Sequence, residues 1–190
     1  MRPMKQHALA IASVLFITAT FACAVHAAGP TVKPAGFDVA KEQASLGNEW
    51  TKWFAADMHL HAVDGAPFPV FAVCTSAGKT NGWVFRTDRV PPVVVGKRGE
   101  IGVLAAIGTD GLIKGVHVLE SHEDAGWFKR LNAAFYQNFT GKPAGSNSLD
   151  TIDTITGATY SSKAVIDDVF KSSQSVMDLP AVKAMRTPAP

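Results

Sequence analysis

The sequence predicts an α+β fold, in which an antiparallel sheet of hairpins packs with an N-terminal, a middle and a C-terminal helix. Three observations support this prediction. Short apolar runs rich in β-branched residues follow one another through the middle of the chain. Asp110-Gly111, between two of these runs, is a strong signal for a tight hairpin turn. Amphipathic patterns of helical period precede and follow the runs, so helices should cover the sheet.

The three helices are predicted from residues that recur every three or four positions. Residues 38–56 should form the first helix, with Asp38 as its N-cap and two tryptophans, Trp50 and Trp53, on its buried face. Residues 127–139 should form the second helix. The apolar faces of the second and third helices comprise Phe128, Leu131, Phe135 and Phe139, and Val165, Ile166, Val169 and Phe170.

Five strands are expected, over residues 58–63, 70–75, 83–87, 101–107 and 112–119. The run at 101–107 is apolar with little interruption, which is typical of a strand buried on both faces. His59 and His61 would share one face of the first strand. Two ligands without a third make a weak metal site, so we expect a solvated strand face there and no metal.

The first 27 residues read as a signal peptide, because Arg2 and Lys5 precede a long apolar run and Val25-His26-Ala27 resembles a cleavage site. We expect cleavage after Ala27 and export to the periplasm. The alternative is an uncleaved membrane anchor, and a lipoprotein site at Cys23 is a weaker possibility. The remaining chain divides into residues 28–80, with the first helix and strands, a principal domain at 81–178, and a flexible tail at 179–190.

Charge and cysteine content exclude several classes of function. The chain has 18 Lys and Arg against 16 Asp and Glu, and Arg2 and Lys5 belong to the signal peptide. The mature chain would therefore be neutral overall, and we expect no nucleic-acid partner. Cys74 would be the one remaining cysteine, so this chain cannot by itself ligate an iron–sulfur cluster or attach a c-type haem.

The segment 153–162 holds the strongest candidate for chemistry. Its sequence, Asp-Thr-Ile-Thr-Gly-Ala-Thr-Tyr-Ser-Ser, places several hydroxyls and a glycine directly before the third helical pattern. Hydroxyl residues suit the start of a helix, where the first backbone N–H groups lack partners, and such an end also suits a phosphate. The segment is therefore either an ordinary capped helix start or a site for a phosphorylated cofactor.

Residues 153–159 match the flavinylation motif of the secreted FMN-binding domain family, in which Asp, two variable residues and Ser or Thr precede Gly-Ala-Thr. The chain resembles this family over about residues 82–176. The family includes the flavin-bearing peripheral subunits of Rnf and sodium-pumping NADH:quinone reductase complexes, and the periplasmic domain of the nitrous-oxide-reductase regulator. The resemblance implies that the C-terminal helix opens at the flavinylation turn. It also implies FMN bound covalently through its phosphate, a modification that would make the chain a phosphoprotein.

The resemblance implies that Thr159 is the attachment residue, modified by a separate flavin transferase that uses FAD. Asp153 would fix the turn or assist the transferase, and Gly157 would let the cofactor approach the backbone. We expect the phosphate to lie against the start of the helix. The cofactor-binding residues carried over or predicted in this segment are Asp153, Thr156, Gly157, Ala158, Thr159, Ser161 and Ser162.

A second part of the site is expected at residues 122–127, where relatives show Glu-Thr-Pro-Gly-Leu-Gly. Glu123 and Gly126 carry over by position, and Trp127 either stacks on the flavin or packs as a core aromatic. His122 is open to two interpretations, a group that tunes the flavin or an exposed side chain. Lys163 could favour an anionic flavin or simply solvate its helix.

These expectations describe an exported electron carrier with no catalytic residues of its own. Its partners would be a membrane-bound reductase or a multihaem cytochrome, together with the transferase. Two alternatives remain open. One is a flavin-dependent reductase subunit that acts on a small exported substrate, so enzyme status is undecided. The other is a domain that binds FMN non-covalently and has a sensing or assembly role.

Overall fold

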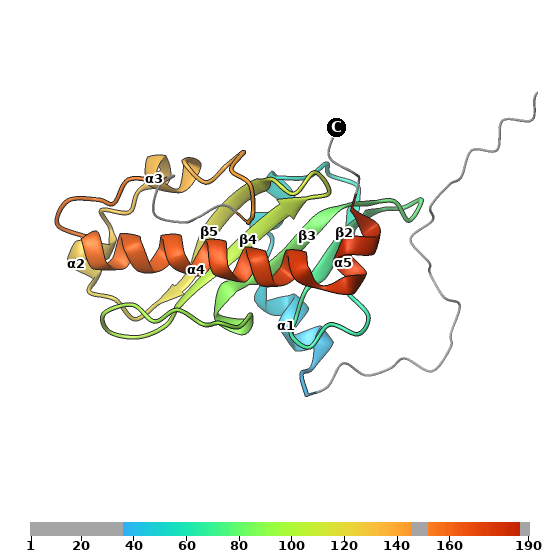
Figure 1. Ribbon diagram of the computed structural model, residues 1–190, viewed down its shortest axis with the longest axis horizontal. Helices are drawn as coiled ribbons and strands as arrows, with labels where there is room; N and C mark the ends of the chain where they lie inside the picture. Colours follow the sequence, from blue (N-terminus) through green and yellow to red (C-terminus); the bar gives the residue numbers. More distant parts are fainter. Residues whose placement is uncertain (1–35, 146–151, 187–190) are drawn as a thin grey trace, which may run out of the picture.

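The computed structural model describes residues 36–145 and 152–186, so the expected signal peptide and its alternatives lie outside the described residues. A five-stranded antiparallel sheet with the order β1-β2-β3-β4-β5 organises the chain (Figure 1). The α+β prediction is confirmed. The strands are β1 Met58–Ala62, β2 Phe71–Thr75, β3 Thr80–Arg86, β4 Ile101–Gly108 and β5 Ile113–Ser121.

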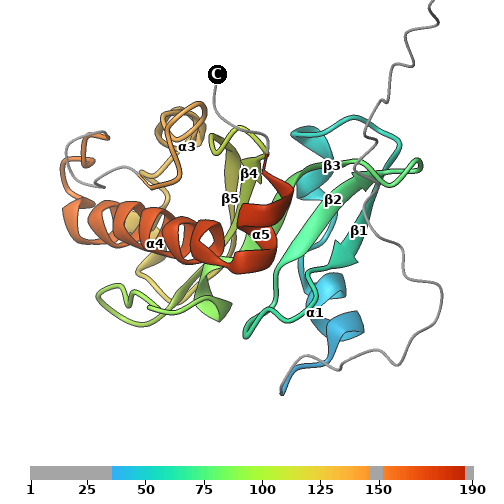
Figure 2. The same ribbon diagram turned by 45° about the vertical axis from the view of Figure 1, so that its right-hand side comes forward.

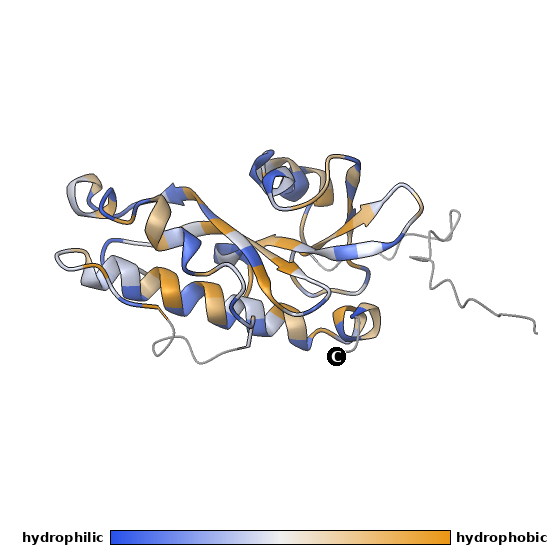
Figure 3. Cartoon of the chain, turned by 90° about the horizontal axis from the view of Figure 1, so that it is seen from above, coloured by the Kyte–Doolittle hydropathy of each residue, from blue (hydrophilic) through white to orange (hydrophobic). Residues whose placement is uncertain are grey.

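Helices cover both faces of the sheet. Figure 3, seen from above, shows the sheet between α1 on one side and the long helix α4 on the other, and Figure 2 shows α5 beside the end of α4. The α-helices are α1 Val39–Ser45, α2 Ala125–Phe128, α3 Ala133–Gln137, α4 Thr159–Asp178 and α5 Pro180–Met185. Two short 3₁₀ helices, η1 Glu49–Lys52 and η2 Thr87–Arg89, complete the described elements.

The interior strand β4, which lies between β3 and β5, contributes to two hydrophobic cores, one on each face. Val103, Ala105 and Ile107 pack in the core beneath α4, whereas Leu104 and Ala106 pack in the core beneath α1. Every residue of β4 is buried. The uninterrupted apolar run at 101–107 therefore has the two-sided burial that its pattern predicts.

The predicted helix at 38–56 is wrong in its length, because the chain forms α1 and then η1 instead. Asp38 caps α1 as expected, since its carboxylate accepts hydrogen bonds from the N–H groups of Ala40 and Lys41. Gly47, with φ of +61°, then ends the helix. A glycine at positive φ just after a helix is the usual way of closing its last turn. Trp50 is nevertheless buried, as predicted.

The second predicted helix, at 127–139, also divides in two. Asp124 caps α2, which begins at residue 125, and Asn132 caps α3 by accepting a hydrogen bond from the N–H of Phe135. An extended Asn132 between them interrupts the helix. The apolar residues still reach the core, since Leu131, Phe135 and Phe139 are buried. Their burial shows that the pattern identified the packed face correctly despite the break.

The chain end differs from the flexible tail expected at 179–190. Pro180 begins α5, in which Val182 is completely buried, and Leu179 is also buried. Proline at the first position of a helix costs no hydrogen bond, because the first N–H groups have no partner within the helix. In residues 36–145 and 152–186, no helix combines the length and hydrophobicity needed to cross a bilayer.

The loop between η2 and β4 is fastened to the side of α4. The N–H of Val94 donates to Asp168 at 3.3 Å, and the hydroxyl of Ser175 donates to the carbonyl of Pro91 at 2.6 Å. At its far end the loop forms a turn, closed by a hydrogen bond from the N–H of Gly96 to the carbonyl of Gly99. This turn carries Lys97 and Arg98 to the N-terminal end of α4.

Candidate functional site

Thr159 is the first residue of α4, and its hydroxyl is not used to cap the helix. Ala158 occupies the N-cap position and provides no side-chain cap. The Thr159 side chain is exposed, and its hydroxyl donates only to the carbonyl of Ile155, at the long distance of 3.5 Å. The sequence left two interpretations of this segment open, an ordinary capped helix start and a cofactor site. The structure does not support the first for Thr159, because its hydroxyl does not cap the helix. Its hydroxyl remains accessible for chemistry.

Ser162 stabilises the 153–162 segment through the hydrogen bonds of its hydroxyl. It is completely buried. Its hydroxyl oxygen accepts a hydrogen bond from the N–H of Ile155 at 3.1 Å and lies 2.9 Å from the carbonyl of Ala158, to which it can donate. These contacts tie the turn to the first turn of α4. Ser162 therefore acts as an internal brace and does not present its hydroxyl to a ligand.

Ser161 is engaged by Glu123, which comes from the loop after β5. The Ser161 hydroxyl donates to a Glu123 carboxylate oxygen at 2.5 Å, and the other oxygen accepts from the N–H of Arg98 at 2.8 Å. Glu123 thus joins three segments distant in sequence, the 96–99 turn, its own loop and α4. A Cβ on Gly96 would lie 2.6 Å from the Glu123 carboxylate, so any larger residue there would have to displace the Glu123 side chain.

Gly157 lies beneath the side chains of Trp127 and Arg130. The Arg130 guanidinium carbon lies 4.5 Å from the centroid of the Trp127 ring, and its Nη1 donates to the carbonyl of Thr156 at 3.3 Å. Gly157 has φ of +81°, and a Cβ there would lie 2.2 Å from Arg130 Nη1. The position therefore favours glycine for two reasons, its backbone conformation and the side chains packed on its Cα.

These residues surround a cavity of about 190 Å³ at the N-terminal end of α4. Small-molecule sites commonly occupy roughly 300–1,000 Å³. A ligand as large as a flavin would therefore fill this cavity and also extend over the surface beside it, where Trp127 and Tyr160 are 50% and 77% exposed. The cavity is lined by Lys97, Arg98, Glu123, Asp124, Trp127, Gly157, Ala158, Thr159, Tyr160 and Ser161.

The structure thus brings together most of the residues predicted for the site, from two segments more than thirty positions apart. Ala158 is buried, whereas Asp153 and Thr156 are exposed on the turn that leads into α4. Gly126 does not line the cavity, and its N–H donates to the Asp124 carboxylate at 2.9 Å within the cap of α2. Trp127 is half exposed at the cavity wall, so it is not a core aromatic.

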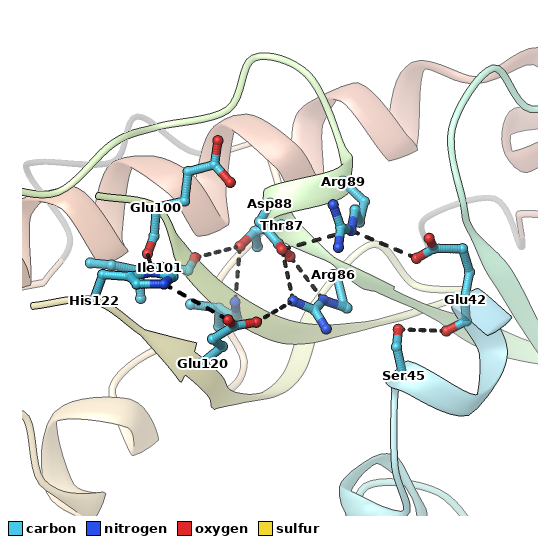
Figure 4. A network of polar contacts seen from close by, with 11 residues as sticks. Glu42, Ser45, Arg86, Thr87, Asp88, Arg89, Glu100, Ile101, Glu120 and His122 are labelled. Carbon is cyan, nitrogen blue, oxygen red and sulfur yellow. Dashed lines mark hydrogen bonds and ion pairs between the residues drawn. The ribbon is translucent and has the colours of Figure 1, made fainter. Parts of the chain in front are cut away.

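His122 and Lys163 lie outside the cavity lining. His122 is exposed and belongs to the polar network of Figure 4, where its ring contacts the carbonyl of Glu100 at 3.5 Å and Glu120 at 4.0 Å. Lys163 is exposed on α4. For both residues, the structure favours the interpretation as solvated side chains.

The same network also includes Arg86, the last residue of β3. Its guanidinium donates to Asp88 at 2.7 Å and to Glu120 at 3.3 Å, and the Asp88 hydrogen bond contributes most to raising the pKa of Arg86. Glu42 of α1 reaches Arg89 at 3.7 Å. These ion pairs connect α1, η2 and β5, and they serve the fold, since none of their members lines the cavity.

Asp168 is a buried carboxylate in the middle of α4, under the loop that carries Lys97 and Arg98. One of its oxygens accepts from the N–H of Val94, and the other has no hydrogen-bond partner. Burial raises its pKa to about 7, and the charges of Asp88 and Glu100 act in the same direction. Hydrogen bonds from Thr87 and Val94 oppose the rise.

A second cavity of the described chain lacks the charged lining of the first. A larger hollow of about 630 Å³ lies between α1, η1 and β1, and His59 is the one titratable side chain in its lining. His59 and His61 are exposed on β1. Within residues 36–145 and 152–186, no group of three or more His, Cys, Asp or Glu side chains is placed to hold a metal ion.

Sequence reasoning missed Lys97, Arg98 and Arg130 as residues of the site. The signal for the first two was available, since Gly96-Lys97-Arg98-Gly99 is a basic turn bracketed by glycines. Arg130 carried no signal, because it lies 26 positions before Thr156 and contacts it only through the tertiary fold.

Comparison with known proteins agrees with this geometry. Residues 96–172 match the family described as FMN-binding domain. The chain is also 34% identical over 115 residues to one subunit of the Na⁺-translocating ferredoxin:NAD⁺ oxidoreductase complex of Acetobacterium woodii. This alignment covers 54% of the chain and 54% of the relative, so the chain spans about half the length of that relative.

The matched region begins at the 96–99 turn and includes β4, β5, the Glu123 loop and most of α4. It contains all of the residues that line the cavity. The cavity and the residues around it therefore lie in the part of the chain that matches the FMN-binding domain family.

Proposed function

We propose that this protein is an electron-transfer flavoprotein that carries FMN covalently on Thr159. The observation that carries the proposal is the Thr159 hydroxyl, which is exposed at the edge of the cavity and has only one long hydrogen bond. The surrounding hydroxyls of Ser161 and Ser162 are held by protein groups. Among the threonine and serine hydroxyls in the first turn of α4, that of Thr159 is thus the one best placed to be modified without breaking the turn.

The attachment would be made by a separate flavin transferase with FAD as donor. The Thr159 oxygen would form a bond to the phosphorus on the FMN side of FAD, the bond between that phosphorus and the bridging oxygen would break, and AMP would leave. The hydroxyl proton would pass to a base of the transferase. A threonine hydroxyl is a poor nucleophile without such a base, and no carboxylate or histidine of the described chain hydrogen bonds to Thr159.

The residues of the site fit this cofactor. Lys97 and Arg98 bring positive charge to a cavity that Glu123 and Asp124 also line, and Arg98 pairs with Asp124 at 3.5 Å. The cavity holds only part of a flavin. When bound, FMN supplies reversible electron transfer, and the protein supplies its anchorage and environment. Trp127 and Tyr160 are exposed beside the attachment residue and offer aromatic faces against which a flavin ring can pack. A cofactor held this way stays accessible to redox partners.

We further propose that the protein is exported and relays electrons between a membrane-bound redox complex and another acceptor. The expected signal peptide supports export. The relative in Acetobacterium woodii belongs to a complex named for Na⁺ translocation and for electron transfer between ferredoxin and NAD⁺, which supports a membrane redox complex as partner. Covalent attachment suits this setting, because a flavin lost outside the cytoplasm is not replaced from a cellular pool.

The proposal is tested by producing the full chain with and without a flavin transferase. The mass of the intact mature protein should increase by one FMN group only when the transferase is present, and flavin fluorescence should remain with the denatured chain. The same mass reports signal cleavage. Thr159→Ala should abolish the added mass. Thr154→Ala, which removes an exposed hydroxyl at a variable position of the same turn, should leave it unchanged.

The results separate the alternatives left open by the sequence. A yellow protein that loses all flavin on denaturation would indicate a non-covalent FMN-binding domain and reject covalent attachment. Flavin that stays attached in Thr159→Ala would reject Thr159 as the attachment residue. A reduced flavoprotein that is reoxidised by a small exported substrate, and not by a multihaem cytochrome or membrane complex, would favour a reductase subunit.

A further inference from the structure

Arg130 is held over the turn that leads into α4 without a carboxylate partner. It stacks on Trp127 at 4.5 Å, and one of its N–H groups donates to the carbonyl of Thr156. In the part of the chain that the structure describes, no Asp or Glu oxygen lies within 4 Å of its guanidinium. Two contacts therefore fix the position of a positive charge that the described residues leave unneutralised.

The place of this charge is electrostatically unusual. Arg130 lies against Gly157, two residues before Thr159, where the N-terminal end of the 20-residue helix α4 already carries a partial positive charge. A cation at this end of a helix is disfavoured unless an anion joins it. The stack on Trp127 compensates in part, since a cation over an indole ring is attracted by its negative face.

The serine hydroxyls that we expected to receive the phosphate are already used. Ser161 donates to Glu123, and Ser162 is buried with its hydroxyl bonded to the backbone of the same turn. Neither can turn toward a phosphate without breaking these contacts. A guanidinium has five N–H donors, and the hydrogen bond to Thr156 uses one of them. Arg130 can thus bind an anion while it keeps its contact with the turn.

We infer that Arg130 binds the phosphate of the FMN that is linked to Thr159, and that Trp127 holds it in place to do so. This inference rests on the proposed function and adds to it a residue from outside the flavinylation motif. The phosphate of a threonine-linked flavin carries one negative charge, which Arg130 neutralises at the end of α4. Charge-assisted hydrogen bonds of this type are stronger than neutral ones and hold the group in a defined orientation.

The test compares two flavins that differ only by the phosphate. Thr159→Ala prevents covalent attachment, so the affinities of free FMN and of riboflavin can be measured by titration of flavin fluorescence. In this background, Arg130→Gln should weaken FMN binding by about ten- to hundredfold and leave riboflavin binding unchanged. Arg130→Lys should recover part of the FMN affinity, because it restores the charge without the planar guanidinium.

Lys129→Gln is the matched control. Lys129 is the neighbouring residue and is also exposed, and its substitution removes the same charge. No hydrogen bond or ion pair joins its side chain to the 153–162 segment in the described part of the chain, and it does not lie against Gly157. It should change the affinities of both flavins by less than about threefold, since an exposed charge at a distance is screened by salt. Thermal unfolding of each variant shows whether the fold is retained.

Three results of the titration would overturn the inference. If Arg130→Gln weakens FMN and riboflavin equally, Arg130 only supports the turn. If FMN affinity is unchanged, Arg130 does not contact the phosphate. A loss that Lys129→Gln reproduces would also reject it, because general electrostatic attraction would then explain the effect.

A second measurement covers the case in which free flavins bind too weakly to titrate. In the chain that retains Thr159, the initial rate of FMN incorporation by the transferase is followed by intact mass. Arg130→Gln should lower this rate by about tenfold relative to Lys129→Gln, and equal rates would overturn the inference. Failure of the proposed function is distinguishable, since the unmodified sequence would then gain no FMN mass at all.

Discussion

The two halves of α4 differ in where polar groups with unused hydrogen-bonding capacity lie, at the surface or in the interior. At its N-terminal end, Ser161 and Ser162 are paired within the protein, and Thr159 and Arg130 keep unused hydrogen-bonding capacity at the surface. In its middle and C-terminal part, Asp168, Ser172 and Ser173 are buried and have side-chain oxygens without partners. Unused capacity at the surface remains hydrated, whereas the same capacity in the interior is destabilising.

We infer that cofactor attachment and folding stability depend on different parts of the same helix. Changes to the exposed groups at the N-terminal end should alter cofactor attachment more than they alter folding. Changes in the buried part should alter folding and its dependence on pH. Substitutions along α4 and in the turn before it test this division.

Asp168 should make the protein less stable as the pH rises from about 4 to about 7. In this range the folded protein keeps the proton, because the pKa of Asp168 is about 7, while the unfolded chain releases it near the ordinary value of 3.8. The folded state therefore binds more protons, and stability falls with increasing pH. Asp168→Asn removes this dependence and should stabilise the protein above pH 7 by up to about 4 kcal/mol.

Urea unfolding of the two proteins at pH 5, 6, 7 and 8 measures the effect. The asparagine that replaces Asp168 can still accept the hydrogen bond from the Val94 N–H, so the fastening of the loop is preserved. The difference in unfolding free energy between the two proteins should increase up to about pH 7 and then become constant. A difference that does not change with pH would show that Asp168 titrates at its ordinary pKa in the folded protein.

Ser162→Ala tests the internal brace of the 153–162 segment. It leaves the partly buried N–H of Ile155 without its acceptor, which should lower the free energy of unfolding by about 1–3 kcal/mol. The rate of FMN incorporation should fall as well, because the turn that presents Thr159 is loosened. Ser173→Ala, which removes a buried hydroxyl farther along α4 that has no hydrogen-bond partner in the described structure, should leave the incorporation rate unchanged.

Gly157→Ala tests the turn by its backbone. A residue with a Cβ at φ of +81° costs about 1–2 kcal/mol, and the Cβ would also displace the Arg130 side chain. Chemical denaturation reports the first effect, and the ratio of FMN to riboflavin affinity reports the second. Gly141, which has φ of +79° and open space around it, provides the control, since Gly141→Ala should show only the stability loss.

Thr159→Ala should have the smallest effect on folding, within about 0.5 kcal/mol, although it abolishes covalent attachment. The side chain is exposed, and its single hydrogen bond is at the limit of the accepted distance. Parallel unfolding curves of the flavin-free proteins measure this. A loss above about 1 kcal/mol would mean that Thr159 helps to hold the helix start, against the division of α4 described above.

The sequence predicted the strands and the packed faces more accurately than the helix boundaries. The apolar runs at 101–107 and 112–119 correspond to β4 and β5, because burial on a sheet depends on the pattern within each run. The breaks at Gly47 and Asn132 were missed although both residues are helix-ending or capping types. In both cases the apolar periodicity continued across the break and concealed it.

The candidate site was predictable only where its residues are adjacent in sequence. The segment 153–159 determines a turn with a threonine at the start of a helix, because the glycine at positive φ, the hydroxyls and the amphipathic pattern are all local signals. Tertiary structure alone decided what surrounds that turn. Glu123, Arg98 and Arg130 come from loops up to about sixty positions away, and only the packing of α4 across the sheet brings them to Thr159.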